Sequence, residues 1–147
     1  MSDAAAPPRL DDMLCFAVHA ASRAITKAYR PALDTLGITY TQYVTLMVLW
    51  ERDGLTLGEL GERLRLDSGT LTPLLKRLER DGLVTRERDP NDERRLRVRL
   101  TQAGTDLRAS ASSVQDKLVC KLDALGIGDV VELRERLVAL VDALDAD

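Results

Sequence analysis

The sequence predicts a mainly α-helical fold with one small β-hairpin. Apolar residues recur at helical spacing in six stretches, and capping or turn-forming residues separate those stretches. In residues 95–100, leucine and valine alternate with arginine, which is the pattern of a half-buried strand. The chain has 147 residues, of which 45% are hydrophobic. It is therefore long and apolar enough to form one domain with its own core.

The first two expected helices are separated by Gly37. Apolar residues keep helical spacing over residues 10–29, and Pro31 then bends or ends this long first helix. Cys15 is expected to lie beyond the first turn of that helix, where the helix dipole contributes little. After Gly37, a narrow apolar stripe predicts a second helix that stops at Gly54.

The third and fourth helices are short and are expected to form a helix-turn-helix. Thr56 and Glu59 have the T-x-x-E spacing of a capping box at the start of the third helix. Asp67 or Ser68 can cap the fourth helix, whose leucines share one face. Pro73 lies inside this helix, so we expect the helix to start later or to begin distorted. In a helix-turn-helix, the second helix binds in the major groove of DNA.

The hairpin that follows carries a row of arginines on one face. Its two strands both alternate, and the turn-forming stretch Asp-Pro-Asn-Asp lies between them. A basic hairpin directly after a helix-turn-helix predicts a winged helix, with Arg94 in the minor groove and Asp92 steadying it. The alternative for the arginine row is a solvated strand face without DNA contacts. The residues expected to contact DNA are Ser68, Thr70, Thr72, Lys76, Arg77, Arg86, Asp92, Arg94 and Arg95.

Charge is distributed unevenly along the chain. The net charge is −3, which by itself is atypical of a DNA-binding protein. Residues 67–100, however, carry nine Lys or Arg against seven Asp or Glu, a balance of +2. The positive charge is therefore concentrated where phosphates would be met, and double-stranded DNA is the expected partner.

The C-terminal third predicts two further helices, broken at residues 126–128. Asp129 and Glu132 have the D-x-x-E spacing of a cap for the last helix. Together with the first helix, these helices carry more apolar surface than a short helix-turn-helix can cover, although an ordinary core accounts for part of it. We therefore expect a homodimer that binds a pseudo-palindrome with half-sites about 10 bp apart. The expected organisation is a single domain of residues 1–147, with dimerisation helices in 1–36 and 101–147 and a DNA-binding region in 37–100.

Two cysteines and one histidine are too few for the common metal sites. Cys15 and Cys120 lie 105 positions apart and form no C-x-x-C pair, and His19 cannot complete a zinc site with them. No apolar run approaches the roughly 20 residues of a membrane span, and the first residues lack the order of a signal peptide. We therefore expect a cytoplasmic protein with reduced thiols and without metal or cofactor. On these grounds alone, the simplest interpretation of Cys15 is a small buried hydrophobe.

The hairpin residues resemble a known family. Residues 92–101 fit the D-x-R-x-x-x-V-x-L-T wing pattern of the MarR regulators, which are winged-helix dimers. Residues 66–84, which read LDSGTLTPLLKRLERDGLV, together with Cys15 near the start of the first helix, are similar to the organic hydroperoxide resistance regulator (OhrR) branch. This resemblance implies a repressor of hydroperoxide resistance genes that peroxide releases from DNA. In that branch a reactive cysteine stands at Cys15, tyrosines that hydrogen-bond it stand at Tyr29 and Tyr40, and one subgroup has a second cysteine at Cys120.

The reactivity of Cys15 depends on groups near its sulfur, because a thiolate attacks peroxide and an ordinary cysteine, with a pKa of about 8.5, is mostly protonated. A hydroxyl that donates to the sulfur stabilises the thiolate by roughly 1.5 to 3 kcal/mol. Tyr29 lies 14 residues beyond Cys15, about 21 Å along a straight helix, so this contact must cross the dimer. Met13 and Phe16 predict an apolar pocket that favours alkyl or lipid hydroperoxides. His19 stands where some members of the branch have another tyrosine, and we interpret it as an imidazole on the helix face.

Three classes of function remain open. The first is a repressor that senses organic hydroperoxides, in which, as the resemblance implies, Cys120 of the partner subunit resolves oxidised Cys15. The second is a MarR-type repressor that a small aromatic ligand releases, with incidental cysteines. The third is a thiol peroxidase, which leaves the basic hairpin without a role. We favour the first class, a regulator that is not an enzyme, over the second, and the second over the third.

Overall fold

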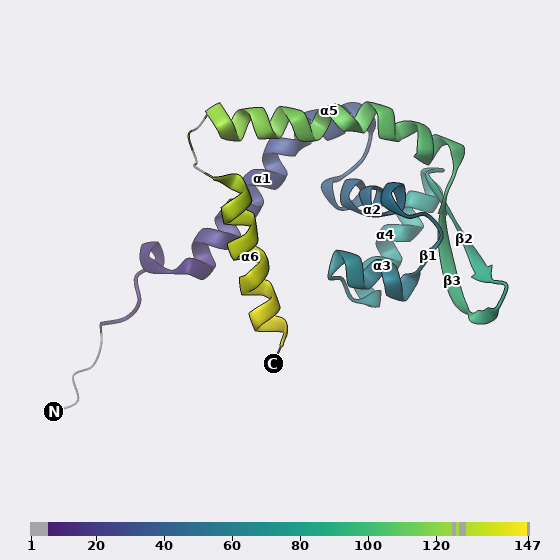
Figure 1. The fold of residues 1–147 in the computed structure, drawn as a ribbon, viewed down its shortest axis with the longest axis horizontal. Helices are drawn as coiled ribbons and strands as arrows, with labels where there is room; N and C mark the ends of the chain where they lie inside the picture. The colour runs from purple at the N-terminus through teal and green to yellow at the C-terminus, as the bar shows by residue number, and fades with distance from the viewer. Residues whose placement is uncertain (1–5, 125, 127–128, 147) are drawn as a thin grey trace. The chain divides into compact units, whose positions relative to one another are not determined.

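A computed structural model describes residues 6–124, 126 and 129–146. It confirms the mainly helical class and adds one strand to the expected hairpin. The chain divides into two units, of which the first ends at Ala111 and the second begins at Ser112. In chain order, the elements are η1 (Leu10–Asp12), α1 (Leu14–Leu36), α2 (Tyr40–Glu51), β1 (Leu55–Thr56), α3 (Leu57–Leu64), α4 (Ser68–Arg80), β2 (Val84–Asp89), β3 (Asp92–Leu100), α5 (Gln102–Ala124) and α6 (Val130–Asp145). Figure 1 labels the α-helices and the strands.

Helix α1 begins and ends later than the sequence predicts. Residues 10–12 form a separate 3-10 turn, and the α-helix then runs from Leu14 through Pro31 without ending there. The proline removes one N–H from the helical ladder. The carbonyl that loses its partner belongs to Lys27, an exposed residue, so water can take the place of that bond. Gly37 ends the helix in the left-handed conformation, with a φ of 70°.

Helix α2 is the central helix of the first unit. At its start, Thr39 Oγ1 accepts from the backbone N–H of Gln42 at 3.2 Å, while Gln42 Oε1 accepts from the N–H of Thr39 at 2.9 Å. Tyr43 on the predicted apolar stripe is buried, but so are Thr45 and Leu49 on other faces. The stripe is wider than predicted because α1, α3 and α4 all contact this helix.

The predicted capping box of α3 is confirmed. Thr56 Oγ1 accepts from the backbone N–H of Glu59 at 3.2 Å, and the Glu59 carboxylate accepts from the N–H of Thr56 at 2.8 Å. The turn after α3 is tight, since a Cβ on Gly61 would lie 2.8 Å from the carbonyl oxygen of Leu66. Arg65 in that turn has a left-handed φ of 54°.

Helix α4 starts at Ser68, so the later start predicted from Pro73 is wrong. Of the two candidate caps, Asp67 fills the role: its carboxylate accepts from the backbone N–H of Thr70 at 2.7 Å. Pro73 leaves the carbonyl of Gly69 without its helical donor. Gly69 is exposed, so water can satisfy that carbonyl and the helix continues through the proline.

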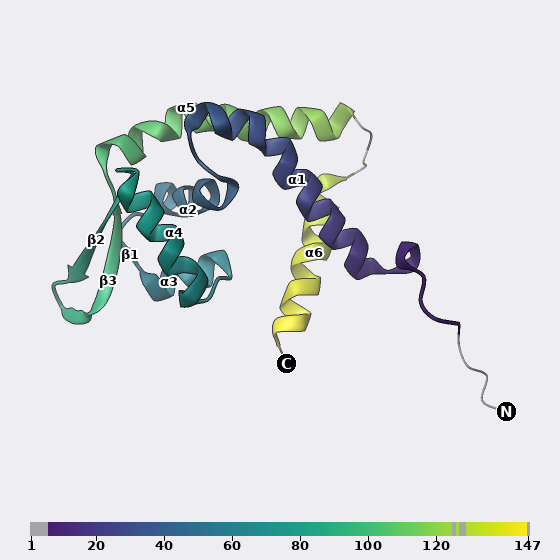
Figure 2. The same ribbon diagram turned by 180° about the vertical axis from the view of Figure 1, so that it is seen from behind.

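Strands β1, β3 and β2, in that order, form an antiparallel sheet. Leu55 pairs with Val98, and Val84 pairs with Leu100. Leu55, Val84 and Val98 are buried, so the apolar face of the hairpin packs inward as predicted. Figure 2 shows the β2–β3 hairpin extending beside α3 and α4. Strand β1 has only two residues, too few to give an alternating pattern, and it was not expected from the sequence.

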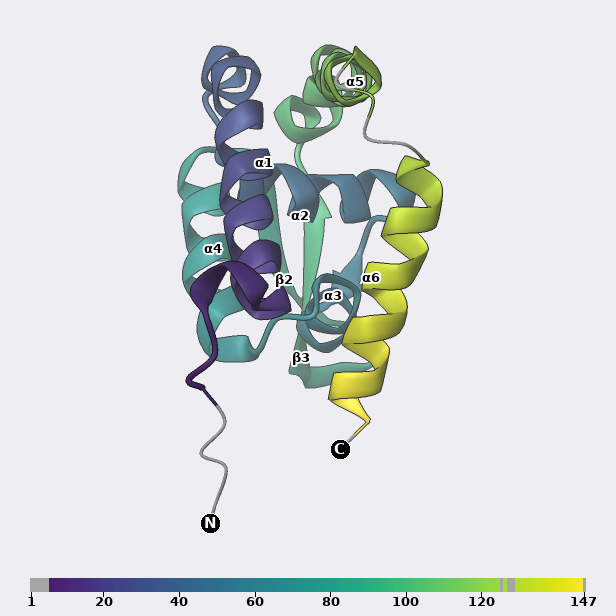
Figure 3. The same cartoon turned by 90° about the vertical axis from the view of Figure 1, so that its left-hand side faces the viewer.

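The second unit contains the rest of α5 and the whole of α6, the yellow helix in Figure 3. The predicted cap is confirmed, because the Asp129 carboxylate accepts from the N–H groups of Val131 and Glu132 at 2.9 and 3.2 Å. Of the expected break before it, Ile127 and Gly128 lie outside the described residues. Within α6 no residue is buried. Its exposed large apolar residues are Val131, Leu133, Leu137, Val138, Val141 and Leu144.

Candidate DNA-binding surface and thiol site

Helix α4 separates an apolar face from a polar and basic one. Its leucines, Leu71, Leu74, Leu75 and Leu78, are all buried. Of the residues predicted to contact DNA, Ser68, Thr70, Lys76 and Arg77 are exposed and Thr72 is half-buried. The helix thus presents short hydroxyl groups and two cations to solvent while its leucines fix it to the core. This is the arrangement required of a helix that enters the major groove.

The tip of the hairpin carries two exposed arginines. Asp92 Oδ1 accepts from the backbone N–H of Arg94 at 3.1 Å, so the carboxylate holds the backbone and leaves the guanidinium in solvent. Its other oxygen lies 3.6 Å from Nε of Arg95. Arg88 also braces the tip, since its Nη1 donates to the carbonyl of Glu93 at 2.7 Å. An open hollow of about 420 Å³ lies beside the two exposed arginines and the start of α3.

Arg86 joins the hairpin to helix α4. Its Nε donates to Glu79 Oε2 at 3.0 Å and its Nη2 donates to Glu79 Oε1 at 3.4 Å. The side-chain hydrogen bond raises the pKa of Arg86 and lowers the pKa of Glu79. The sequence alone does not indicate this pair, because seven positions across a turn match neither helical nor strand spacing. The predicted DNA contact at Arg86 therefore starts from a guanidinium that already has a partner.

Arg97 lies in the predicted arginine row, yet its guanidinium faces the protein. Nη2 lies 2.9 Å from Asp89 Oδ2, Nε donates to the same oxygen at 3.0 Å, and Nη1 donates to the carbonyl of Gly54 at 2.7 Å. Asp89 is buried. Two hydrogen bonds lower the pKa of the Asp89 carboxyl group: the larger effect comes from the backbone N–H of Asn91 and a smaller one from the side chain of Arg97. The sequence shows Asp89 only as a turn former. The pair braces β3 against the loop that precedes β1.

Cys15 is a free, exposed thiol in the first turn of α1. Both early expectations were wrong: it does not lie beyond the first turn, because the helix begins at Leu14, and it is not buried within this chain. In a first turn, unpaired backbone N–H groups and the helix dipole favour negative charge. Met13, Leu14 and Phe16 are exposed as well, although they are large and apolar. Cys120 is a free, exposed thiol on α5, in the second unit.

The two predicted thiol-supporting tyrosines lie together, away from Cys15. The ring centroids of Tyr29 and Tyr40 are 5.2 Å apart, and Tyr29 also lies 5.9 Å from Tyr43. Burial raises the pKa of Tyr29 to about 12, with smaller contributions from Tyr40 and Tyr43, so its hydroxyl keeps its proton at neutral pH. Cys15 and Tyr29 occupy one continuous helix, 14 residues apart, which corresponds to about 21 Å. The two groups therefore do not meet within one chain.

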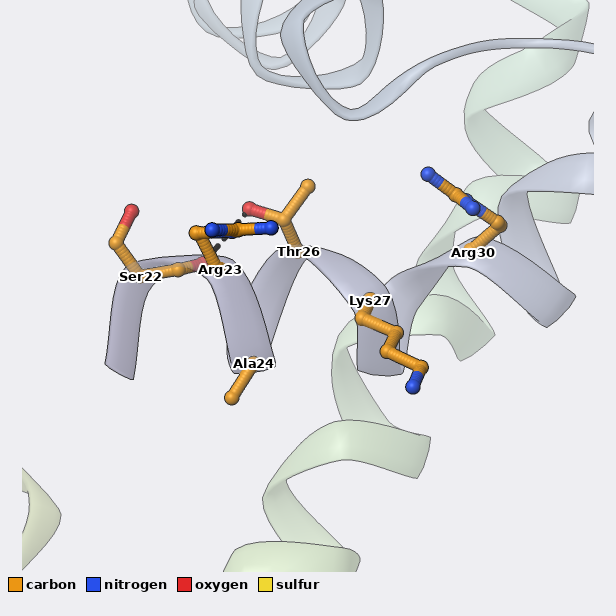
Figure 4. Close-up of a pocket in the computed structure, with 6 residues that line it drawn as sticks. All are labelled: Ser22, Arg23, Ala24, Thr26, Lys27 and Arg30. Carbon is orange, nitrogen blue, oxygen red and sulfur yellow. Dashed lines mark hydrogen bonds between the residues drawn. The ribbon is translucent and has the colours of Figure 1, made fainter. Parts of the chain in front are cut away.

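A basic stretch of α1 borders an open hollow of about 450 Å³, which was not foreseen from the sequence (Figure 4). Thr26 Oγ1 donates to the carbonyl of Ser22 at 2.9 Å, as the dashed line shows. The lining residues are Ser22, Arg23, Ala24, Thr26, Lys27 and Arg30. All six belong to one helix, so the hollow is not an enclosed site for a small molecule.

The described residues contain no group of three or more His, Cys, Asp or Glu side chains placed to hold a metal ion. In the same residues, every helix is too short or too polar to cross a membrane.

Comparisons of the sequence with known proteins agree on one protein family. Residues 38–96 match the MarR family. The organic hydroperoxide resistance transcriptional regulator of Bacillus subtilis strain 168 is 43% identical over 136 residues, which cover 92% of each protein.

Two sets of solved structures share the fold. The regulator MosR of Mycobacterium tuberculosis in complex with DNA is 30% identical with a TM-score of 0.82, over 91% of this chain and 97% of its own. Reduced AbfR bound to DNA is 35% identical with a TM-score of 0.76, over 94% of each chain. Disulfide-formed AbfR, a Staphylococcus epidermidis protein, is 38% identical with a TM-score of 0.65, over 90% of this chain and 93% of its own.

Proposed function

Because the chain belongs to the MarR family of DNA-binding transcriptional regulators, we propose that it is a repressor whose operator binding ends when an organic hydroperoxide oxidises Cys15. The observation that carries this proposal is the position of Cys15, an exposed thiol in a helical first turn among exposed apolar side chains. The hydroperoxide regulator of Bacillus subtilis, similar over nearly the whole chain, supports it. The apolar surroundings favour an alkyl or lipid hydroperoxide, whose tail gains about 0.8 kcal/mol for each buried CH₂.

The functional unit is a homodimer. The first half of α1 exposes Leu14 and Ile25, and α6 exposes apolar residues along its length. Such surfaces are rarely left in water and mark interfaces. In the dimer, Tyr29 and Tyr40 of one subunit donate their hydroxyls to Cys15 of the other, since Tyr29 cannot reach the thiol of its own chain. The hydroxyl of Tyr29, whose pKa burial raises to about 12, is protonated and can donate to a thiolate.

Oxidation proceeds in two balanced steps. The Cys15 thiolate attacks the distal oxygen of the hydroperoxide, so that an S–O bond forms while the O–O bond breaks. The sulfur becomes a sulfenic acid, and the alkoxide that is left takes up a proton and departs as an alcohol. The thiol of Cys120 from the partner subunit then attacks that sulfur, which releases water and forms an inter-subunit disulfide. Because a disulfide requires Cα atoms within about 7 Å, this step constrains the terminal helices. The disulfide form known for AbfR supports this step.

DNA binding uses the exposed face of α4 and the tip of the hairpin. In the dimer, two α4 helices enter successive major grooves, about 10 bp apart, of a pseudo-palindromic operator. Lys76, Arg77 and Arg95 meet phosphates, and Arg94 enters the minor groove. A disulfide that shifts the terminal helices changes the separation of the two α4 helices and so releases the operator.

The test is DNA binding measured before and after addition of a few equivalents of cumene hydroperoxide. Wild-type protein should bind a palindromic operator when reduced and lose it after oxidation, whereas Cys15→Ser should bind under both conditions. On non-reducing electrophoresis, oxidised wild type should form a covalent dimer that is absent in Cys120→Ser.

A Cys15→Ser protein that is still released by hydroperoxide rules out this thiol as the sensor. A response of Cys15→Ser to a phenolic compound equal to that of wild type favours the ligand-released class instead. Steady consumption of hydroperoxide with a thiol reductant, without any effect on DNA binding, favours a peroxidase.

A further inference from the structure

A row of aromatic rings extends along helix α2, with Tyr29 of α1 as one of its members. Tyr40 is the first residue of α2 and Trp50 is the second-to-last. The row begins with Tyr40 against Tyr29 at 5.2 Å, continues from Tyr29 to Tyr43 at 5.9 Å, and ends with Tyr43 and Trp50 at 6.4 Å between centroids. Tyr29 and Tyr43 are buried. A displacement of the Tyr29 ring therefore requires the next rings in the row to move or to repack.

The far end of the row is fixed by one hydrogen bond. The indole Nε1–H of Trp50 donates to the carbonyl of Gly104, in the first turn of α5, at 2.9 Å. Gly104 packs closely against the segment that follows α4, since a Cβ on Gly104 would lie 2.1 Å from the carbonyl oxygen of Leu83. Only glycine allows this approach. The indole is therefore bonded to a residue that packs against the segment directly after α4, the helix expected to enter the major groove and called the recognition helix below.

Thr101 completes the connection to α4. Its Oγ1 accepts from the N–H of Gly104 at 3.1 Å and donates to the carbonyl of Gly82 at 2.6 Å, while its N–H donates to the carbonyl of Leu83 at 3.0 Å. Gly82 and Leu83 follow directly after α4 and lead into β2. A displacement of Gly104 would therefore move Gly82 and Leu83, which connect the end of α4 to the start of β2.

We propose that Trp50 is a positioning residue that couples Tyr29 and Tyr40, the tyrosines proposed to contact the thiol of the partner subunit, to the recognition helix through its hydrogen bond to Gly104. This inference rests on the proposed function, in which Tyr29 donates to Cys15 of the partner subunit and loses that partner when the sulfur is oxidised. The change at Tyr29 passes along the buried rings to Trp50, which shifts the first turn of α5 and with it the end of α4. Two discrete arrangements of this contact are the switch that couples the two sites.

The variant Trp50→Phe isolates the hydrogen bond, because it keeps an aromatic ring but removes the N–H donor. Reduced Trp50→Phe should bind the operator with an affinity within about twofold of wild type. Its Cys15 thiol should react with cumene hydroperoxide at a rate within about twofold of wild type. Its loss of DNA affinity on oxidation should be at least about fivefold smaller than that of wild type, within the range of allosteric couplings. The matched control is Gln102→Ala, which removes an exposed hydrogen bond to Asp106 in the same part of α5 and should respond like wild type.

A second measurement needs no variant. Trp50 is the only tryptophan of the chain, so its fluorescence reports this contact directly, and the emission of wild type should shift on oxidation. The inference is overturned if oxidised Trp50→Phe releases DNA as completely as wild type, or if Gln102→Ala retains DNA after oxidation to the same extent as Trp50→Phe. It is also overturned if Cys15 is oxidised more slowly in Trp50→Phe, or if the tryptophan emission of wild type does not change on oxidation. If wild type itself keeps its operator after oxidation, the proposed function fails, and the emission then tests separately whether oxidation reaches Trp50.

Discussion

Helices α4 and α6 are both leucine-rich, yet they use their leucines in opposite ways. The leucines of α4 are at most 7% exposed, whereas the large apolar residues exposed on α6 range from 37% to 69%. Helix α1 combines the two patterns, because Tyr29 and Leu33 near its C-terminal end are buried while Leu14 near its start is exposed. The first unit is therefore folded around its own core, whereas α6 and the start of α1 leave apolar side chains exposed, as the proposed dimer requires.

The largest expected effect on stability comes from truncating a buried leucine of α4, compared with truncating an exposed leucine of α6. Leu75→Ala should lower the free energy of unfolding by about 2 to 5 kcal/mol, because Leu75 is completely buried. Leu137→Ala in α6 should leave the fold intact and weaken dimerisation instead. Chemical denaturation and sedimentation velocity of the two variants measure the contrast. Equal loss of unfolding free energy in both, without any change in subunit association, would contradict it.

The buried end of α1 makes a prediction at alkaline pH. The pKa of Tyr29 is raised from 10.0 to about 12 in the folded state, so between these values the unfolded chain releases a proton that the folded chain keeps. The free energy of unfolding therefore falls as pH rises through this window. Tyr29→Phe should lose less stability across it than wild type, by roughly 1 to 3 kcal/mol. Urea denaturation at several pH values tests this, and parallel curves for the two proteins would mean that Tyr29 titrates like an exposed tyrosine.

The solvent face of the first unit is the next point to test. Arg94→Ala should weaken operator binding by roughly 1 to 3 kcal/mol while the fold stays unchanged, because the guanidinium is exposed in the free protein. Fluorescence anisotropy with a labelled operator measures this. Arg63→Ala, at an arginine whose ion pair with Glu51 is exposed and lies outside the predicted DNA-contact residues, is the matched control. Wild-type affinity in Arg94→Ala at moderate salt would show that the wing tip does not contact DNA.

The smallest effect concerns the tie between α4 and the wing. Glu79→Gln removes the charge that pairs with Arg86, an ion pair that is partly exposed, so the free energy of unfolding should hardly change. Operator binding should instead become more sensitive to salt, because a freed Arg86 can contact phosphate. The slope of log affinity against log salt concentration measures this. An unchanged slope together with lower affinity would indicate that the pair only holds the hairpin in place.

Local signals in the sequence predicted the local features of this structure. The capping box at Thr56, the Asp129 cap and the inward face of β3 all follow from residues within a few positions of one another. The contacts that sequence reasoning missed join distant segments: Arg97 with Gly54, and Trp50 with Gly104. No periodicity records such contacts. Of the effects predicted for the two prolines, the end of a helix at Pro31 and the later start at Pro73 are wrong. Whether a proline breaks a helix depends on whether the freed carbonyl can reach water, which only the fold decides.

For the candidate site, the sequence pointed to Cys15 and to the exposed face of α4. The spacing of 14 residues between Cys15 and Tyr29, together with the family resemblance, also predicted a contact between two subunits, and that contact stays a prediction. The proposed function therefore depends on one contact, in which Tyr29 of one subunit donates to Cys15 of the other.

Mixed dimers test whether this contact crosses the dimer. A dimer of one Cys15→Ser chain and one Tyr29→Phe chain contains a single reactive thiol, on the Tyr29→Phe chain, opposite an intact Tyr29 on the other. If the contact crosses the dimer, this thiol should react with cumene hydroperoxide as fast as wild type, while the Tyr29→Phe homodimer reacts more slowly. A mixed dimer as slow as the Tyr29→Phe homodimer would place the tyrosine and the thiol in the same chain and contradict the account.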